Sequence, residues 1–355
     1  MSHAHADTAA RHARLQLAVD AGLTLPDTGD IAVLRPRAGE WFDPLPRDRL
    51  HMVQGFRPDH DAFASAGFTV TPDLMGRFAG IMVCLPRAKA EARALIAAAA
   101  THSDGWVIVD GQKADGIEGV LREVRARAPI GGAIAKAHGK LFWFDAHALD
   151  TSADDFSGWH AQPLRLDDPE VPGFVTLPGL FSADGIDPAS RLLAESLPDA
   201  LPPVVADLGA GWGYLAARVL QHAGIQTLHM VEAEAAALDC ARQNIQDPRA
   251  QFHWADATTL TLTPPVDMVV MNPPFHTGHK GQPALGVQFI ATAKRILKPQ
   301  GSLWMVANRH LPYEAALTDA FRDIDEVGGT ASFKLYRASH PLREKQRTQS
   351  RKGQR

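Results

Sequence analysis

The residues with the clearest chemical potential form a glycine-rich turn, Asp207-Leu208-Gly209-Ala210-Gly211-Trp212-Gly213. The turn follows an apolar run and precedes a stretch with helical spacing, so it is predicted to join a buried strand to a helix. Glycines let the backbone pass close to a bound nucleoside, and the first N–H groups of a helix attract an anion. An aspartate two positions before the first glycine is typical of S-adenosylmethionine (SAM) sites. The segment 211–216 also satisfies the dinucleotide pattern GxGxxA, so the turn alone leaves SAM, NAD and a purely structural turn open.

Two acidic residues follow the next two expected strands of the same half. Glu232 ends the run TLHMVE, where a carboxylate can accept hydrogen bonds from both ribose hydroxyls of an adenosine. Asp256 follows the third strand and is placed to accept from an adenine amino group. NAD and SAM sites share the ribose acceptor, and each residue taken alone could be an ordinary surface carboxylate. The pair therefore supports nucleoside binding without selecting the cofactor.

The run Asn272-Pro273-Pro274-Phe275 selects between the two cofactors. It follows the apolar strand VDMVVM directly, and its consecutive prolines fix φ and remove backbone donors. The carboxamide oxygen of Asn272 and the carbonyl of Pro273 can together accept both hydrogens of a planar NH₂ group, while Phe275 offers a flat face for stacking. Such a corner suits an amine held toward a methyl donor, and a dehydrogenase has no use for it. The sequence therefore favours SAM over NAD.

Residues 174–338 resemble a class I SAM-dependent methyltransferase with the Asn-Pro-Pro-Phe signature of amino-group methylation. The strings FSADGIDPAS, NPPFHTGHK, VANRHLPYE and FKLYRA closely resemble those of the bacterial ribosomal RNA guanine-N2 methyltransferases of the RsmC/RlmG type. The resemblance implies SAM as cofactor, the N2 amine of a guanine as target, and ribosomal RNA or a ribosomal subunit as partner. The N-terminal run MSHAHADTAARHARLQLAVD lacks the apolar core of a secretory signal, so we expect a cytoplasmic enzyme. We further expect a monomer without a membrane or metal site.

The resemblance also implies a role for individual positions. The residues expected to bind the cofactor are Asp207, Gly209, Gly211, Gly213, Glu232, Asp256, Phe181 and Asp184, and those expected to hold the target amine are Asn272, Pro273, Pro274 and Phe275. His276 belongs to the same family string, but its role stays open. Neutral Asn272 cannot act as a base, so the released proton is expected to pass to solvent, and most of the rate would come from alignment and the exclusion of water.

Strand and helix signals alternate through the C-terminal half. Strands are expected at 203–209, 227–232, 250–254, 266–271 and 301–308, and helices at 214–223, 234–245, 283–298 and 313–322. The last runs, 323–327 and 331–337, flank Gly328-Gly329 and predict a hairpin. This alternation predicts a mostly parallel sheet of seven strands with an antiparallel end.

The N-terminal half shows the same rhythm more weakly. Strands are expected at 80–86, 105–111, 130–137 and 140–145, and helices at 87–101 and 113–127, but none of these strands is followed by a glycine-rich turn. The fold class is therefore α/β with two tandem Rossmann-like methyltransferase domains, the first of them degenerate, as the family resemblance of VIVDGQKADGIEGVLREV and GKLFWFDA also implies. The expected divisions are a docking and stabilising domain (1–160), a linker (161–173), the catalytic domain (174–338) and a basic tail (339–355).

The composition of the chain excludes several classes of protein and several kinds of site. The chain has 355 residues, 45% of them hydrophobic and 21% charged, which excludes global disorder. Two cysteines exclude a disulfide framework, and the 16 histidines lack any metal-ligand spacing. A net charge of −4 argues against a generic nucleic-acid binder, yet the last thirteen residues, REKQRTQSRKGQR, hold six basic residues and one acidic residue. This tail is predicted to be disordered, and it is either a solubilising extension or an arm that seeks phosphate.

Other functions also fit parts of the pattern. A protein glutamine-N5 or an adenine-N6 methyltransferase would present the same planar NH₂ group to Asn272. A non-catalytic RNA-binding protein with a vestigial SAM fold is a third reading, against which the intact turn, Glu232 and Asn272 argue. An NAD-linked oxidoreductase fails on the Asn-Pro-Pro-Phe run.

Overall fold

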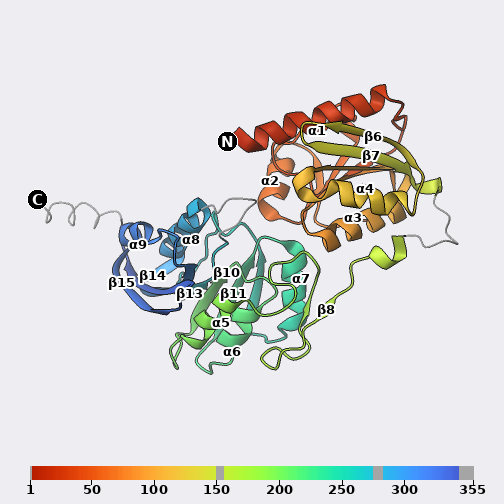
Figure 1. Cartoon of the computed structure of the whole chain (residues 1–355). Helices are drawn as coiled ribbons and strands as arrows, with labels where there is room; N and C mark the ends of the chain where they lie inside the picture. Colours follow the sequence, from red (N-terminus) through yellow and green to blue (C-terminus); the bar gives the residue numbers. More distant parts are fainter. Residues whose placement is uncertain (1, 149–155, 275–282, 344–355) are drawn as a thin grey trace, which may run out of the picture. The chain divides into compact units, whose positions relative to one another are not determined.

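The chain forms two compact units. The computed structural model describes residues 2–148, 156–274 and 283–343. The first unit comprises Met1–Pro163 with Leu177–Gly179, and the second comprises Leu164–Thr176 with Leu180–Arg355 (Figure 1). The segment expected to be a linker, 161–173, thus lies mostly within the second unit. None of the helices in the described ranges is long and apolar enough to cross a membrane.

The second unit is built on one seven-stranded sheet. Its elements are β8 (Leu164–Arg165), β9 (Val175–Thr176), α5 (Pro188–Glu195), β10 (Val204–Leu208), α6 (Tyr214–Leu220), β11 (Thr227–Glu232), α7 (Ala235–Asn244), β12 (Ala250–Trp254), β13 (Val266–Met271), α8 (Pro283–Ile296), β14 (Leu297–Asn308), α9 (Glu314–Ala320), β15 (Phe321–Gly329) and β16 (Phe333–Pro341). The strand order is β12-β11-β10-β13-β14-β16-β15, and β8 pairs separately with β9. All neighbours from β12 to β14 are parallel, whereas β16 is antiparallel to β14 and β15. The predicted parallel sheet with an antiparallel end is confirmed.

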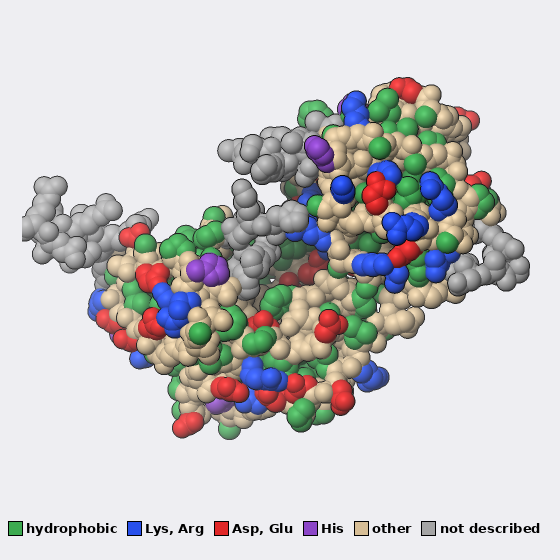
Figure 2. All heavy atoms as spheres, viewed as in Figure 1, with side chains coloured by type: hydrophobic (Ala, Val, Ile, Leu, Met, Phe, Trp, Pro, Cys, Tyr) green, Lys and Arg blue, Asp and Glu red, His purple; other side chains and the backbone are tan. Residues whose placement is uncertain are grey.

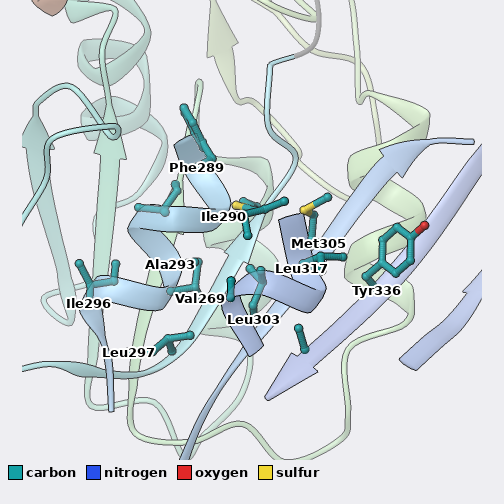
Figure 3. Packing of buried hydrophobic residues seen from close by; sticks show 14 of the residues in the cluster. Val269, Phe289, Ile290, Ala293, Ile296, Leu297, Leu303, Met305, Leu317 and Tyr336 are labelled. Atoms are coloured by element: carbon teal, nitrogen blue, oxygen red, sulfur yellow. The ribbon is translucent and has the colours of Figure 1, made fainter. Parts of the chain in front are cut away.

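Alternation along the strands divides the second unit into two cores, because successive side chains of a strand point to opposite faces. Val269 and Met271 of β13 pack with α8 and α9 in one core, part of which is shown in Figure 3. Met268 and Val270 pack on the other face with α6 and α7. The residue after the strand, Asn272, therefore continues the alternation onto the second face, where α5 and α6 lie against each other.

The C-terminal hairpin is longer than the sequence predicts. β15 extends through Gly328-Gly329, and the connection to β16 lies at residues 330–332, so the pair of glycines is not the turn itself. A register shift between Glu326 and Gly328 marks a bulge in β15, which accommodates the glycines inside the strand. β16 continues to Pro341, past the expected domain end at 338. The tail predicted to be disordered, 339–355, therefore begins inside a strand, and the prediction is wrong for residues 339–341. Its residues 344–355 lie outside the described ranges.

The first unit repeats the same topology with different elements. They are α1 (Ser2–Asp20), β1 (Ile31–Leu34), η1 (Arg47–Arg49), β2 (Leu50–Val53), α2 (Arg57–Ser65), β3 (Thr69–Thr71), β4 (Phe78–Cys84), α3 (Lys89–His102), β5 (Ser103–Gln112), η2 (Lys113–Asp115), α4 (Ile117–Arg125), β6 (Ile130–Lys136), β7 (Gly139–Asp145), η3 (Ala146–Ala148) and η4 (Phe156–Trp159). The strand order β3-β2-β1-β4-β5-β7-β6 is the order of the second sheet, strand for strand. α3 and α4 pack on one face of this sheet, and α1 and α2 pack on the other. The predicted pair of Rossmann-like units is confirmed.

The two units differ in the connection that follows the first strand of each sheet. In the second unit β10 leads into α6, whereas in the first unit β1 leads only into a loop with the short helix η1 before β2 begins. β1, β2 and β3 were not predicted from the sequence. Each is a run of four residues or fewer, too short for a period to be read, and packing against neighbouring strands decides its conformation.

Candidate active site

The glycine-rich turn starts at the carboxyl end of β10, which is hydrogen-bonded to β11 and to β13. The N–H groups of Gly209 and Ala210 both donate to the carbonyl of Val231, at 2.9 and 3.0 Å, so the turn is tied to the next strand. Gly211 has a φ of +54°, and nothing in the described structure lies within 4 Å of the position that a Cβ would occupy. The glycine therefore provides a left-handed backbone beside open space, which suits a ligand lying close to the main chain.

Asp207 is a fully buried carboxylate near the end of β10. It is 0% exposed, and among the described residues neither of its carboxylate oxygens has a hydrogen-bond partner. Burial, and then the nearby charge of Glu232, raise the pKa of Asp207 to about 8, while the backbone N–H of Ala216 opposes the shift. An orphaned acceptor next to a glycine turn fits a ligand that brings positive charge, and SAM carries both a sulfonium and an ammonium group. The residues present at this end of the sheet thus fit SAM.

Glu232 stands at the end of β11, as the sequence predicts for a ribose acceptor. Its Oε2 accepts from the N–H of Gly211 at 2.8 Å and its Oε1 from that of Glu234 at 2.8 Å. Burial raises the pKa of Glu232, while these backbone donors oppose the shift. A carboxylate oxygen has two lone pairs, so each oxygen of Glu232 can still accept a ligand hydroxyl while its orientation is fixed.

Asp256 is engaged in a local turn. Its Oδ1 accepts from the N–H and from the hydroxyl of Thr258, both at 2.7 Å. This is the ordinary loop interaction that the sequence left open as an alternative. It fixes one oxygen of Asp256 and leaves Oδ2 for an adenine amino group.

The Asn272 side chain is held by the start of α5. Its Nδ2 donates to Oδ2 of Asp187 at 2.9 Å and to Oγ of Ser190 at 2.9 Å. Asp187 is also the N-cap of α5, because the same Oδ2 accepts from the N–H of Ser190 at 2.7 Å. These contacts leave the carboxamide oxygen of Asn272 as the group that faces away from α5.

A cavity connects the turn with the Asn-Pro-Pro corner. Its lining residues are Phe181, Ser182, Asp187, Ser190, Gly209, Ala210, Gly211, Trp212, Tyr214, Leu215 and Asn272. The structure thus brings Phe181, Gly209, Gly211 and Asn272 together as the sequence predicts. None of the other predicted residues within the described ranges lines the cavity, and Asp184 is exposed. Phe275 and His276 lie outside the described residues.

Sequence reasoning missed the functional contacts of four lining residues. Asp187 and Ser190 both belong to the family string FSADGIDPAS, but nothing in that string shows that either contacts Asn272. Trp212 donates its indole N–H to the carbonyl of Ser182 at 3.2 Å, and Tyr214 donates its hydroxyl to Oε2 of Glu170 at 2.9 Å. The first contact ties the turn to the segment that precedes α5, and no local pattern in the sequence announces it.

The equivalent turn of the first unit does not begin with a glycine. Its Arg35 N–H donates to the carbonyl of Val53 at 2.9 Å, which is the bond that Gly209 makes with Val231 at 2.9 Å in the second unit. Arg35 therefore occupies the place of the first glycine. It has a φ of +57°, so the left-handed turn survives with a long side chain on it.

Gln54 occupies the place of Glu232 in the first unit. Its Oε1 accepts from the N–H of Phe56 at 2.8 Å, as Oε1 of Glu232 accepts from Glu234 at 2.8 Å. Its Nε2 donates to the carbonyl of Pro36 at 2.5 Å, and the side chain is only 2% exposed. The acceptor for ribose hydroxyls is thus replaced by a neutral, buried amide that is committed to its own loop.

Comparisons with known proteins agree with this geometry. A family model described as the methyltransferase small domain matches residues 172–337. The ribosomal RNA large subunit methyltransferase G of Shewanella amazonensis is 33% identical over 245 residues, which cover 67% of this chain and 63% of that protein. The ribosomal RNA small subunit methyltransferase C of Shewanella denitrificans is 30% identical over 279 residues, which cover 76% of this chain and 79% of that protein. The chain belongs to this family of ribosomal RNA methyltransferases.

A solved structure extends the likeness of this methyltransferase to both units. The 16S rRNA N2 methyltransferase (RsmC) of T. thermophilus, solved with AdoMet and guanosine, matches with a TM-score of 0.73 at 23% identity. The match covers 93% of this chain and 91% of that one, so the two-unit fold is shared as a whole. The predicted family, fold class and dependence of the methyltransferase on SAM are confirmed.

Proposed function

We propose that this methyltransferase transfers a methyl group from SAM to the exocyclic N2 amine of a guanine in ribosomal RNA. The observation that carries the proposal is the placement of Asn272, with its amide nitrogen bound on α5, in one cavity with Gly209 and Gly211. The relatives named above act on ribosomal RNA, and the matched structure is an N2 methyltransferase solved with guanosine. Both favour ribosomal guanine over a protein glutamine or an adenine.

The main task of the protein in this reaction is to align the target amine with the methyl group of SAM. SAM supplies an activated methyl group, so no residue has to generate an electrophile. The oxygen of Asn272 and the carbonyl of Pro273 accept the two N–H groups of the target amine and favour a nitrogen whose lone pair points along the reaction axis. The amine gains the methyl group and releases one proton to solvent. The target base must be unstacked or single-stranded to reach the cavity.

The proposed cofactor contacts lie along the ends of β10 and β11. Gly209, Gly211 and Gly213 would let the backbone approach the nucleoside, and Glu232 would accept from the ribose. The buried carboxylate of Asp207 would balance positive charge on the cofactor. Three further contacts are proposed. Asp256 would accept from the adenine amino group, and Phe275 would stack on the target base. Phe181 and Asp184 would border the cofactor. Phe181 lines the cavity with 60% of its surface exposed, so it offers a free aromatic face.

The first unit is proposed to dock RNA and to bind no SAM. Figure 2 shows Lys and Arg side chains gathered over α3 and α4, with acidic side chains between them. Basic residues on and beside these helices include Lys89, Arg93, Arg122, Arg125 and Arg127. Glu123 pairs with Arg93 at 2.9 Å and Lys89 at 2.5 Å, whereas Arg122 and Arg125 are exposed. Such a surface suits phosphate contacts, which position RNA without reading its bases. We also propose that the protein is a monomer in the cytoplasm.

The test compares binding and transfer in one variant. Asn272→Ala should lower methyl transfer to ribosomal RNA from a strain lacking the gene by on the order of 10²-fold or more, because one positioned acceptor is lost. SAM affinity measured by calorimetry should stay unchanged, since Asn272 touches the amine and not the adenosine. Gln251→Ala, which removes an exposed amide on β12, is the matched control and should behave as wild type. Transfer by Asn272→Ala within a few-fold of wild type would refute the assignment.

A variant of the glycine-rich turn should lose SAM binding, which Asn272→Ala should keep. Gly209→Val forces a β-branched side chain onto a residue with a φ of +78°, so it should abolish SAM binding itself. Unchanged calorimetric affinity in this variant would mean that the turn is not the cofactor site.

A further inference from the structure

The amide of Asn272 can present two different groups to the cavity. A carboxamide carries an acceptor oxygen on one side and a donor NH₂ group on the other, and rotation by half a turn exchanges them. The proposed amine substrate needs the oxygen, because a reversed amide would direct N–H groups against N–H groups. The orientation of Asn272 therefore decides whether the corner attracts or repels the target.

Two side chains of the α5 start surround the nitrogen of this amide. Nδ2 of Asn272 lies 2.9 Å from Oδ2 of Asp187 and 2.9 Å from Oγ of Ser190. A hydroxyl donates or accepts, so Ser190 fits either orientation of the amide. A carboxylate only accepts, so Asp187 fits only the orientation in which NH₂ points toward α5.

We infer that Asp187 is the positioning residue that fixes the Asn272 amide with its oxygen toward the target amine, with Ser190 as the second acceptor. The inference rests on the proposed function, since it assigns Asn272 to the amine. Asp187 touches neither the target nor the transferred group in this role and acts only through Asn272.

Asp187 is itself prevented from turning away. Its Oδ2 accepts from both the N–H of Ser190 at 2.7 Å and Nδ2 of Asn272 at 2.9 Å. Rotation of the carboxylate away from Asn272 would therefore also uncap the helix. Pro188 follows at the first helical position, and Leu193 is 0% exposed, so the helix start is anchored by its own backbone and by the core.

The fixed amide also gives chemical selectivity. Guanine presents an amine at N2 and a carbonyl oxygen at O6, which are opposite partners for a carboxamide. With its oxygen outward, Asn272 accepts from the amine and faces a carbonyl acceptor with another acceptor. Asp187 thereby contributes to the choice of an amino group as the methylated atom.

The test separates the capping role of Asp187 from its contact with Asn272. Asp187→Ser keeps a good N-cap, but its shorter side chain does not reach Asn272. Ser190→Ala removes the second acceptor and leaves the capped N–H of residue 190 in place. Asp187→Asn is the conservative rescue variant, because its carboxamide oxygen can take the place of Oδ2 and accept both bonds while the charge is lost.

The expected result is a loss of turnover without a loss of cofactor binding. In full-length protein acting on ribosomal RNA from the deletion strain, Asp187→Ser combined with Ser190→Ala should lower kcat by on the order of 10- to 100-fold. SAM affinity should be unchanged, and Asp187→Asn should recover most of the activity. Inactivity of the wild type would instead overturn the proposed function. Wild-type turnover together with near-wild-type turnover of the double variant would overturn the role of Asp187.

A second measurement is independent of methyl transfer. Asn272→Asp places a carboxylate against Asp187, so it should lower the unfolding temperature of the cofactor-free protein. The same change in the Asp187→Asn background should lower it less, because the facing negative charge is gone. Equal losses in the two backgrounds would show that Asp187 does not face the nitrogen of Asn272 and would overturn the inference.

Discussion

Asp207→Asn should stabilise the cofactor-free protein while it weakens the binding of SAM. Burial and the charge of Glu232 raise the pKa of Asp207 to about 8, from an ordinary value of 3.8. Because the folded pKa is the higher one, the folded protein between about pH 4 and about pH 8 keeps a proton that the unfolded chain has already released. Stability is therefore lost as the pH rises through this window. Asparagine has the shape of the protonated acid and carries no such dependence.

The magnitude follows from the two pKa values. Each unit of difference corresponds to about 1.4 kcal/mol, so keeping Asp207 protonated at about pH 7 costs on the order of 4 kcal/mol. At about pH 5 the same cost is only about 2 kcal/mol. The free energy of unfolding of Asp207→Asn should exceed that of the wild type, and the excess should grow by about 1.4 kcal/mol for each pH unit between these two conditions.

Urea unfolding of both proteins without cofactor at about pH 5 and about pH 7 measures this excess. The transition that added SAM shifts to higher urea in the wild type identifies the second unit. Asp199→Asn, an exposed carboxylate in the same unit, is the matched control and should show no pH-dependent gain. An excess that is the same at both pH values would refute the reasoning, because it would mean that Asp207 titrates alike in the folded and unfolded chain. SAM affinity should fall in the variant, since the neutral amide no longer balances cofactor charge.

Three further predictions concern packing, a buried ion pair and the tail. Gly286→Ala should lower the unfolding temperature, because the added Cβ would lie 2.2 Å from the hydroxyl oxygen of Tyr313, and such overpacking costs about 1–3 kcal/mol. Arg14→Met should destabilise the first unit by about 1.5–3 kcal/mol, because it removes a buried ion pair with Asp110 at 2.6 Å while Arg11, at 2.7 Å, still pairs with that carboxylate. Truncation after Arg343 should weaken RNA binding and flatten its salt dependence by about 0.7 in logarithmic slope for each lost phosphate contact, with SAM affinity unchanged.

Matched variants make each of these results interpretable. Gly119→Ala in α4 has nothing within 4 Å of its added Cβ and should not destabilise the protein. Arg77→Met removes an ion pair with Asp104 whose side chains are half exposed, so its effect should stay below about 1 kcal/mol. Destabilisation by Gly286→Ala or Arg14→Met no greater than by its control would contradict the packing or ion-pair argument. Equal salt slopes for full-length and truncated protein would mean that the tail only solubilises. A truncation at Arg337 is unsuitable, because β16 extends beyond that residue.

Much of the second unit could be predicted from the sequence because its strands and turns follow from residue types that are neighbours along the chain. The strand over Val266–Met271 is observed as expected, since a run of apolar residues bounded by turn signals leaves little choice of conformation. The glycines of the turn lie in left-handed conformations, which the residue type itself suggests. The Asn-Pro-Pro corner follows the strand for the same local reason, because prolines end the pattern of strand hydrogen bonds.

The fold class of the first unit was predicted from the sequence, but its first three strands were not. The runs at Ile31–Leu34 and Leu50–Val53 are too short to distinguish strand from loop, and their conformation follows from pairing with each other and with β4. The tertiary structure also shows why this unit lacks a cofactor turn. Register places Arg35 and Gln54 at the positions of the glycine and the acid, and nothing in the local sequence marks them as equivalents.

The residue types of the active site and the strand ends that carry them can be read from the chain, since both depend on neighbouring residues. What those residues touch follows from the folded arrangement alone. Asn272 and Asp187 are 85 positions apart, and they meet because alternation along β13 turns Asn272 toward the face that α5 covers. The buried state of Asp207, and with it the raised pKa, likewise depends on packing from distant segments. Hydrogen-bond direction and desolvation are properties of these long-range contacts, so no local pattern could have supplied them.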